Sequence, residues 1–519
     1  MNDAGSTGIA NKSIILIAFA AALAFAFDHL FVWKIPGISA VVFTVLVGGV
    51  LIALSLLFKR RIPRDVALLL LVAIFFSGMV AVRANPLLTA LNIAGSMFLL
   101  LLITEVNVRG SLRGFISSDY LKIVGLPLWY LISLLDTVTS IRLPSTRSVD
   151  NKSKQIIRGV LITAPVIVLF AGLFAGADPV FHKVISSFFN IYIPSPEHPA
   201  VIIVVFALAC GALGYSFSKE SSVKGAATAP RRPMGHIETS ILLGSVNALF
   251  IIFIALQATY FFGGVTNIAN DTFTFAQYAR RGFFELITIS VFTYLILLGT
   301  EKLIERDAEH HSKAFQYLSA ALVVQVMVLM VFAFNRLSLY ESAFGFTTLR
   351  LYSHAFIMLL AVVYLFLLYK IFVDTRESTF LLRTFLAVVV FVAGMNLLNP
   401  DAFIAHKNLE RFNATGKIDF DYLSGLSSDA APVLLAIFQK GDAIVRSPLG
   451  RALYDRSTVE QGPWQSWNLS RENEMQLLKN HQSTLQAYKD YQKLVLEAAN
   501  DEIQADLEAS GFSQGSVLQ

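Results

Sequence analysis

The segment VVFTVLVGGVLIALSLLFKRRIPRDVALLLLVAIFFSGMVAV (residues 41–82) contains two apolar runs on either side of the basic sequence KRRIPRD (59–65). Each run approaches the roughly twenty residues that an α-helix needs to cross about 30 Å of hydrocarbon. Lysine and arginine collect in the connections that face the cytoplasm. The segment therefore predicts two transmembrane helices joined by a short cytoplasmic turn.

The rest of the chain repeats this pattern. Of its 519 residues, 55% are hydrophobic and 15% are charged, against about 25% charged residues in ordinary soluble domains. The mean hydropathy is +0.63. We expect about eleven membrane spans, at residues 12–33, 37–58, 65–82, 86–104, 156–176, 199–217, 239–262, 282–300, 315–334, 353–373 and 380–398. The predicted fold class is all-α, a polytopic transmembrane helix bundle with a C-terminal helical soluble domain.

Changes in composition divide the chain into four predicted regions. Residues 1–104 form an N-terminal region of four spans, and 105–155 form a basic cytoplasmic or interfacial segment that is too polar to span comfortably. Residues 156–398 form a second membrane region, and 399–519 form an acidic helical extracytoplasmic domain. This last region holds 11 Lys and Arg against 16 Asp and Glu, whereas the whole chain has a net charge of +5. The positive balance thus belongs to the membrane regions and gives no indication of nucleic-acid binding.

The basic residues also predict the orientation of the chain. They are concentrated in alternate connections, at 59–65, 105–155, 218–238 and 301–314. We assign these connections to the cytoplasm, because the opposite connections carry fewer Lys and Arg. The N-terminus is then cytoplasmic, and an odd number of spans places the C-terminal region on the other side of the membrane.

The C-terminal region is expected to be a series of helices. Asn399 is a candidate cap, Pro400 suits the first helical position, and Gly416 ends the first helix. Ser470 is a candidate cap for a long polar helix that follows it. The expected elements are helices over 400–412, 419–425 and 430–440, a loop over 447–468, and the long helix over 471–508.

The chain shows no pattern that indicates metal or cofactor chemistry. Its single cysteine, Cys210, lies in an apolar run, which excludes an intramolecular disulfide and a cysteine-based metal site. His310 and His311 are adjacent, and adjacent helical residues point about 100° apart, so they are poorly placed to chelate together. The chain contains no phosphate-binding loop, nucleophile elbow or zinc-protease motif. We expect no cofactor, no metal and no catalytic residue.

The segment FAQYARRGFFELITIS (275–290) places charges at the predicted outer end of a span. Arg281 and Glu285 are four residues apart and can pair on one face of a helix. A polar loop is expected over 334–356 and lies on the same predicted side. One interpretation is a binding site for an anionic lipid headgroup, glycan or solute, formed by Tyr260, Tyr278, Arg280, Arg281, Glu285, Arg336 and Arg350. The alternative, which we favour, is an interfacial ion pair with arginines that reach lipid phosphates.

A further polar group begins the C-terminal region. Asp401, Ile404, Asn408 and Arg411 recur at helical spacing and therefore share one face. We expect this face, with Asn399, to dock the C-terminal region onto the outer loops of the membrane regions. A catalytic role for Asp401 or for His406 is the alternative.

Four motifs resemble those of a known family. They are TYFFGG (259–264), QYARRGFFEL (277–286), FGFTTLRLY (344–352) and LNPDAFIAHKNLER (398–411). Together they resemble the bacterial multi-pass membrane proteins grouped as domain of unknown function 4173, which are related to the unknown-function group 4153. The resemblance extends from about the fifth span to about residue 440, and it implies a bacterial inner-membrane protein without an assigned reaction. The residues that stand in these motifs are Tyr278, Arg280, Arg281, Glu285, Arg350, Asn399, Asp401, Asn408 and Arg411.

Three functions remain open at this point. The preferred one is a non-enzymatic platform for binding, sensing or assembly in the cell envelope, because catalytic motifs are absent from the sequence. The second is a transporter or flippase for an anionic lipid or glycan precursor. The third is a membrane transferase that uses Glu285 or Asp401 as a base. The expected partners are membrane lipids and, through residues 399–519, an envelope protein.

Overall fold

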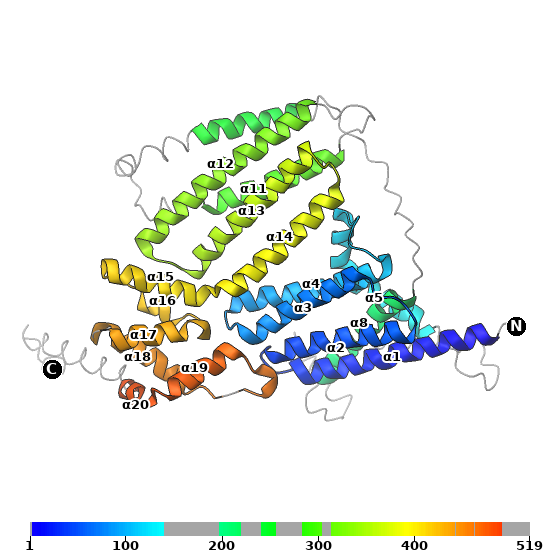
Figure 1. Cartoon of the computed structure of the whole chain (residues 1–519), viewed down its shortest axis with the longest axis horizontal. Coiled ribbons are helices and arrows are strands. Elements are labelled where there is room, and N and C mark those ends of the chain that lie inside the picture. Colours follow the sequence, from blue (N-terminus) through cyan, green and yellow to red (C-terminus); the bar gives the residue numbers. More distant parts are fainter. Residues whose placement is uncertain are drawn as a thin grey trace, which may run out of the picture.

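The computed structural model describes residues 3–139, 197–218, 240–255, 283–303, 313–441, 443–460 and 462–489. Every regular element within these ranges is a helix (Figure 1). The predicted all-α fold class is therefore confirmed. Seven helices in the described part of the chain are long and apolar enough to cross a membrane. The chain is thus a membrane protein, and the number of about eleven spans stays a prediction.

Six helices form the first packed group. They are α1 (Asp3–Phe31), α2 (Ile38–Leu57), α3 (Arg64–Val82), α4 (Pro86–Arg109), α5 (Ser117–Thr139) and α8 (Glu197–Ser218). Side chains from these helices share one apolar core, in which Leu54, Leu99 and Ile123 are fully buried. The long helices carry apolar side chains around their whole circumference. Each helix therefore buries the face that meets a neighbour and leaves its other faces for lipid.

A second group contains the helices α11 (Phe283–Leu303), α12 (Lys313–Phe344) and α13 (Thr348–Phe372), together with an unlabelled helix over Ser240–Ala255. Leu322, Val326 and Tyr364 are fully buried in its core. The Tyr364 hydroxyl donates to the Ser290 carbonyl of α11 at 2.6 Å. Figure 1 shows this group, in green and yellow-green, at an angle to the first group.

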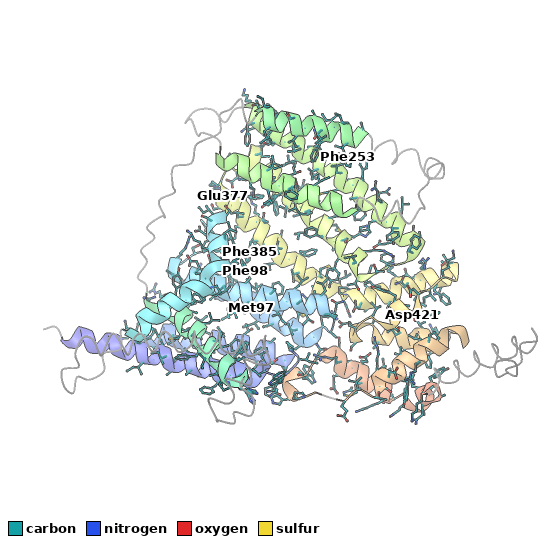
Figure 2. The ribbon with its side chains drawn as sticks, turned by 180° about the vertical axis from the view of Figure 1, so that it is seen from behind. Met97, Phe98, Phe253, Glu377, Phe385 and Asp421 are labelled. Atoms are coloured by element: carbon teal, nitrogen blue, oxygen red, sulfur yellow. The ribbon has the colours of Figure 1, made fainter. Side chains whose placement is uncertain are left out.

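Helix α14 (Glu377–Leu398) joins the two groups. It packs along α13 and also contacts α4 and α5. Phe385 of α14 and Phe98 of α4, both labelled in Figure 2, pack against the core of the first group. Between the same two helices, the buried amides of Asn92 and Asn396 exchange two hydrogen bonds of 2.8 Å. Since α14 leads directly into the C-terminal helices, it connects all three parts of the molecule.

The seven long apolar helices agree with predicted spans. Their apolar segments are Lys12–Phe31, Ile38–Leu57, Arg64–Val82, Pro86–Arg109, Lys313–Phe344, Thr348–Phe372 and Glu377–Leu398. Three further predicted spans coincide with shorter apolar helices, at Val201–Phe217, Ser240–Ala255 and Ile289–Gly299. The predicted span at 156–176 lies outside the described residues.

The C-terminal helices, defined here as residues 400–489, lie at one end of the membrane helices (Figure 1). They are α15 (Pro400–Thr415), α16 (Phe420–Ser424), η1 (Ser428–Ala430), α17 (Ala431–Lys440), α18 (Ala443–Ser457), η2 (Trp464–Ser466), α19 (Leu469–Lys479), α20 (Gln482–Leu485) and η3 (Gln486–Tyr488). Their own apolar core includes Ile404, Leu434, Leu453 and Leu478. Leu351 of α13 joins this core, so the C-terminal helices and the second group share apolar contacts.

The structure corrects two sequence predictions in the C-terminal helices. The predicted loop over 447–468 is wrong in its first half, because α18 continues to Ser457 with Pro448 inside it. Complete burial of Leu449 and Leu453 outweighs the backbone hydrogen bond that Pro448 cannot donate. The predicted long helix over 471–508 is also wrong, because α19 ends at Lys479 and α20 begins at Gln482. The turn between them lets both Leu478 and Leu485 enter the core.

Two smaller corrections concern turns. The polar segment 334–356 is helical except for residues 345–347, where the short turn between α12 and α13 lies. Asn399 does not cap α15 with its side chain. Its left-handed φ of 55° instead turns the chain between α14 and α15, a conformation that asparagine adopts more readily than most residues.

Candidate functional site at the junction with the C-terminal helices

The predicted outer-face site falls largely outside the described residues. Tyr260, Tyr278, Arg280 and Arg281 lie between the helix Ser240–Ala255 and α11, in a segment that the structure does not describe. The backbone of Glu285 belongs to α11, but its side chain is likewise outside the described part. The pairing of Arg281 with Glu285 therefore stays a prediction.

The other two outer-face candidates lie where α12 and α13 meet. Arg336 is buried within α12. Arg350 lies in the first turn of α13, where its guanidinium contacts the Gly345 carbonyl and stacks 4.1 Å from the ring centre of Tyr340. These contacts close the turn between the two helices. Arg350 of α13 thus has one partner in α12 and one in the turn.

Glu341 and His354 form a buried pair about one helical turn away from residues 345–347. His354 Nδ1 is 3.1 Å from a carboxylate oxygen of Glu341, and His354 Nε2 is 3.2 Å from the Ser338 hydroxyl. Both side chains are largely buried between α12 and α13. Ionisable groups at this depth in membrane helices are candidates for function.

The predicted docking residues contact the turn between α12 and α13. The Asn408 side chain accepts a hydrogen bond from the Phe346 N–H at 2.9 Å and donates to the Phe346 carbonyl at 2.8 Å. Arg411 donates to the carbonyls of Ala343 and Ser342, at 2.7 and 3.3 Å. Helix α15 is therefore hydrogen-bonded to this turn through backbone groups.

Asp401 contacts a different turn, the one between α3 and α4. One of its carboxylate oxygens accepts from the Asn85 amide at 2.8 Å, and the other accepts from the Ser427 N–H at 3.0 Å. The side-chain oxygen Oδ1 of Asn85 in turn accepts from the Leu88 N–H at 2.9 Å and caps α4. Asp401 and Asn85 are both buried, so the carboxylate is held entirely by protein donors.

Asp429 makes the most extensive contacts with the same turn. One oxygen accepts from the backbone N–H groups of Ala84 and Asn85, at 2.8 and 2.9 Å. The other accepts from the Ser470 hydroxyl at 2.5 Å and lies 4.0 Å from Arg83. We refer to Asn85, Asp401, Ser427, Asp429 and Ser470 as the junction cluster.

A third turn, between α1 and α2, contacts the segment 464–471. The Ile38 N–H donates to the Trp467 carbonyl at 2.9 Å, and Arg471 donates to the Pro36 carbonyl at 3.4 Å. Next to it, the buried Asn468 amide donates to the carbonyls of Val80 and Arg83, both at 2.9 Å. The C-terminal helices are thus bonded to three separate turns at the same end of the membrane helices.

Sequence reasoning identified Asp401, Asn408 and Arg411 but missed most of the junction cluster. Asn85 precedes Pro86, and this pair is a typical signal for the start of a helix. Asn468 also caps α19 through the Arg471 N–H, so the predicted cap at Ser470 is wrong. Ser470 instead contacts Asp429. No pattern in the sequence indicates that Asp429 meets residues 84 and 85, because the contact spans more than 340 positions.

A second polar cluster lies at the opposite end of the membrane helices. Arg109 donates to Glu105 at 2.6 Å and to Asp119 at 2.9 Å, and the Tyr215 hydroxyl donates to Glu105 at 2.6 Å. We refer to these four residues as the Arg109 cluster. It joins α4, α5 and α8, and both carboxylates are buried.

The charge state of Asp119 follows from these contacts. Burial alone would raise the pKa of the Asp119 carboxyl. The hydrogen bonds from Arg109 and from the Ile116 N–H, together with the charges of Arg109 and Lys122, lower its pKa below the ordinary value. Asp119 is therefore ionised and paired at neutral pH.

The geometry of both clusters indicates structural roles. Each carboxylate accepts from protein donors on separate chain segments, and these hydrogen bonds hold the segments together. Among the described residues, no group of three or more His, Cys, Asp or Glu side chains is placed to hold a metal ion. The junction cluster can therefore position the C-terminal helices, and no reaction follows from its geometry.

Comparison with known proteins places the chain in a family. A family model described as domain of unknown function (DUF4153) matches residues 66–437, from α3 into α17. No curated protein and no solved structure matches the chain. The match confirms the relation to group 4153 that the sequence motifs indicated. The narrower resemblance to group 4173 stays a prediction.

Proposed function

The chain belongs to the DUF4153 family, which is described as a domain of unknown function, and we propose that it is a non-enzymatic platform of the bacterial inner membrane. The C-terminal helices lie outside the cytoplasm, where they bind, sense or assemble an envelope partner. The membrane helices hold them in a fixed position. The junction cluster carries this proposal.

Rigid attachment of the C-terminal helices supports the platform. Asp401 and Asp429 are buried, and their oxygens are occupied by donors from two different chain regions. Removing one partner of such a group costs the full desolvation penalty of the other, about 1–3 kcal/mol for each neutral group. Hydrogen bonds to three separate turns therefore hold the C-terminal helices in one position. A lid, in contrast, would have to move.

The distribution of charge supports the orientation. At the end away from the C-terminal helices, the turn between α2 and α3 carries Lys59, Arg60 and Arg61. Arg113 and Arg376 lie in other turns of that end. Basic residues in the turns that contact the C-terminal helices are fewer, with Lys34 and Arg83 as examples. This asymmetry favours a cytoplasmic location for the basic end.

Thiol labelling tests the orientation. Cys210 is the single cysteine and is buried, so an added cysteine can be followed alone. We expect Val459→Cys, at an exposed position of the C-terminal helices, to react with a membrane-impermeant maleimide in intact cells. The matched variant Arg61→Cys should react only after the membrane is permeabilised. The reverse pattern would overturn the proposed orientation.

Photo-crosslinking in intact cells tests the platform. A photoreactive residue at Asp421 or Val459, both exposed, should yield a crosslink to the same protein from each position. The same residue at Arg61 should not yield it, and Asp429→Ala should abolish the crosslink by releasing the C-terminal helices. Absence of a common crosslinked protein from the two positions would contradict the proposal.

Transport of an anionic lipid or glycan precursor is the second candidate, and the buried pair Glu341–His354 favours it. The pair lies between two membrane helices near their outer ends. Purified protein in vesicles should then move a fluorescent anionic lipid analogue, and Glu341→Gln should abolish this movement. If movement of the lipid analogue depends on Glu341, transport would replace the platform as the proposed function.

A further inference from the structure

The segment Trp464-Gln465-Ser466-Trp467 inverts the usual arrangement of polar and apolar side chains. Gln465 and Ser466 are buried, at 4% and 8% exposure, whereas Trp464 and Trp467 are 56% and 40% exposed. In water, a protein gains by burying indole rings and leaving amides and hydroxyls exposed. The inversion indicates that the outer side of this segment faces an environment that is more favourable to indole than water is.

Further apolar residues lie on the turn that contacts this segment. Trp33 and Ile35, between α1 and α2, are 73% and 64% exposed. The His29 and Trp464 rings are 6.4 Å apart, and the Ile38 N–H donates to the Trp467 carbonyl. Three of the four tryptophans in the chain therefore gather at one place. Such clustering is not explained by packing, since all three rings remain exposed.

The backbone at this place is arranged to hold the exposed rings. Trp33 has a φ of 59°, in the left-handed region where a helix normally ends with glycine. A bulky residue in this conformation costs about 1–2 kcal/mol. On the other side of the contact, a Cβ at Gly37 would collide with the backbone of Ser466 and Trp467. Glycine thus permits the close approach of the two segments, while Trp33 occupies a strained position.

The position along the membrane helices identifies the environment. Helix α1 ends at Phe31 and α2 begins at Ile38, so Trp33 and Ile35 lie where two spans leave the hydrocarbon. The segment 464–467 is held against this turn and lies at the same level. Tryptophan concentrates at this level, because its ring is apolar and its N–H still reaches water or headgroups. Lys34 and Arg471 lie beside it, where basic groups can meet lipid phosphates.

We propose that Trp33, Ile35, Trp464 and Trp467 form a lipid anchor. It inserts into the membrane–water interface on the non-cytoplasmic side of the inner membrane. The C-terminal helices are then attached to the bilayer itself as well as to the turns of the membrane helices. This anchor uses residues on both sides of the family match at 66–437. It joins the first membrane hairpin to the far end of the chain.

Tryptophan quenching by brominated phosphatidylcholine in nanodiscs tests the anchor. In a chain that carries Trp33→Phe, Trp129→Phe and Trp467→Phe and so keeps only Trp464, we expect blue-shifted emission. We also expect a loss of intensity that is largest when the bromines lie near the headgroup end of the acyl chains. Two single-tryptophan references bracket this result. Leu46→Trp, in the middle of α2, should be quenched most by bromines near the chain ends, and Val459→Trp should not be quenched.

Each outcome decides the proposal. Quenching of Trp464 no greater than that of the Val459→Trp reference would overturn it. Protection of Trp464 from aqueous iodide without quenching by any brominated lipid would indicate a protein cover and would overturn it as well. The unsubstituted chain provides the same readout if the variants fail to fold, because its emission comes from four tryptophans, three of which belong to the anchor. Its quenching should also be strongest with bromines near the headgroups.

Discussion

The two ends of the membrane helices hold buried carboxylates in different ways. At one end, Glu105 and Asp119 share the guanidinium of Arg109. At the other end, Asp401 and Asp429 accept mainly from N–H, amide and hydroxyl groups, and the nearest guanidinium, that of Arg83, is 4.0 Å from Asp429. The Arg109 cluster is therefore held by charge pairing. The junction cluster is held by the geometry of its donors.

This difference predicts how each end fails. Loss of the guanidinium would leave two buried negative charges close together, which is the more costly defect. Loss of a junction carboxylate would leave unpaired backbone N–H groups, which is less costly for each group. The first defect should weaken the packing of α4, α5 and α8, and the second should release the C-terminal helices.

Arg109→Met should have the largest effect. Removing one partner of a buried ion pair costs about 3–5 kcal/mol. Here both Glu105 and Asp119 lose the guanidinium, and the cation that stays near them is Lys122, 3.6 Å from Asp119. We expect a loss of this size in the free energy of unfolding, measured by steric trapping in bicelles. Arg113→Met, at an exposed position of the same turn, is the control and should change little. Equal losses in the free energy of unfolding from the two substitutions would show that the Arg109 cluster stabilises the fold no more than an exposed arginine does.

Asp429→Ala should follow. It leaves the N–H groups of Ala84 and Asn85 unpaired, at a cost of about 1–3 kcal/mol for each group. Limited proteolysis should then cleave the C-terminal helices earlier, while the membrane helices stay protected. Asp421→Asn, at an exposed position of α16, provides the comparison. Unchanged proteolysis of the Asp429 variant would mean that the junction cluster does not hold the C-terminal helices.

Gly345→Ala should weaken the contact of α15 with the turn between α12 and α13. Gly345 has a φ of 82°, and an added Cβ would lie 2.5 Å from the side-chain oxygen Oδ1 of Asn408. Strain and displacement together should cost about 1–3 kcal/mol. Gly78→Ala in α3 is a suitable control, because a Cβ there meets no atom within 4 Å. Thermal unfolding of the two variants should separate them clearly.

Replacing the Asn92–Asn396 pair should have a smaller effect. Hydrogen bonds between membrane helices contribute about 0.6 kcal/mol on average. Asn92→Leu and Asn396→Leu should each lower the free energy of unfolding, because each single change leaves one buried amide unpaired. The two losses should add up to more than the loss in the double variant. Ser77→Ala, whose hydroxyl bonds only within α3, should show no such coupling. An additive cycle would contradict the pairing.

Acidification should reveal the smallest effect, through Asp119. Its pKa in the folded state is lowered, so its stabilising contribution is present above the unfolded pKa of about 4 and is lost as the pH falls through the folded value. Asp119→Asn should therefore be less stable than the unsubstituted chain at pH 7 and lose less stability between about pH 4 and pH 3. Unfolding free energies at these pH values test the sign. Asp421→Asn should retain the full loss.

Several features of the fold followed from local sequence. Apolar runs of about twenty residues predicted the seven long helices, because the requirement to cross hydrocarbon leaves few alternatives. Asp419 and Gly416 mark helix ends in the structure because the signals of such ends act over a few residues. Asp401, Asn408 and Arg411 were singled out because they share one face of a helix, and in the structure each contacts a turn of the membrane helices.

Other features depended on contacts that no local pattern encodes. Pro448 was expected to lie in a loop, yet burial of Leu449 and Leu453 keeps α18 intact through it. The predicted long helix after Ser470 ends at Lys479, because two leucines reach one core. In both cases, the free energy of burial exceeded the local preference of the backbone.

The sequence by itself determined that this is an all-α membrane protein and where its long spans lie, because hydrophobicity and helix length act within a single segment. The tertiary structure decided which polar groups satisfy one another. Asp429 meets Asn85, and Trp467 meets Ile38, across more than 340 positions of the chain. Such pairings follow from the packing of three groups of helices, since only the folded backbone brings these donors and acceptors within 3 Å.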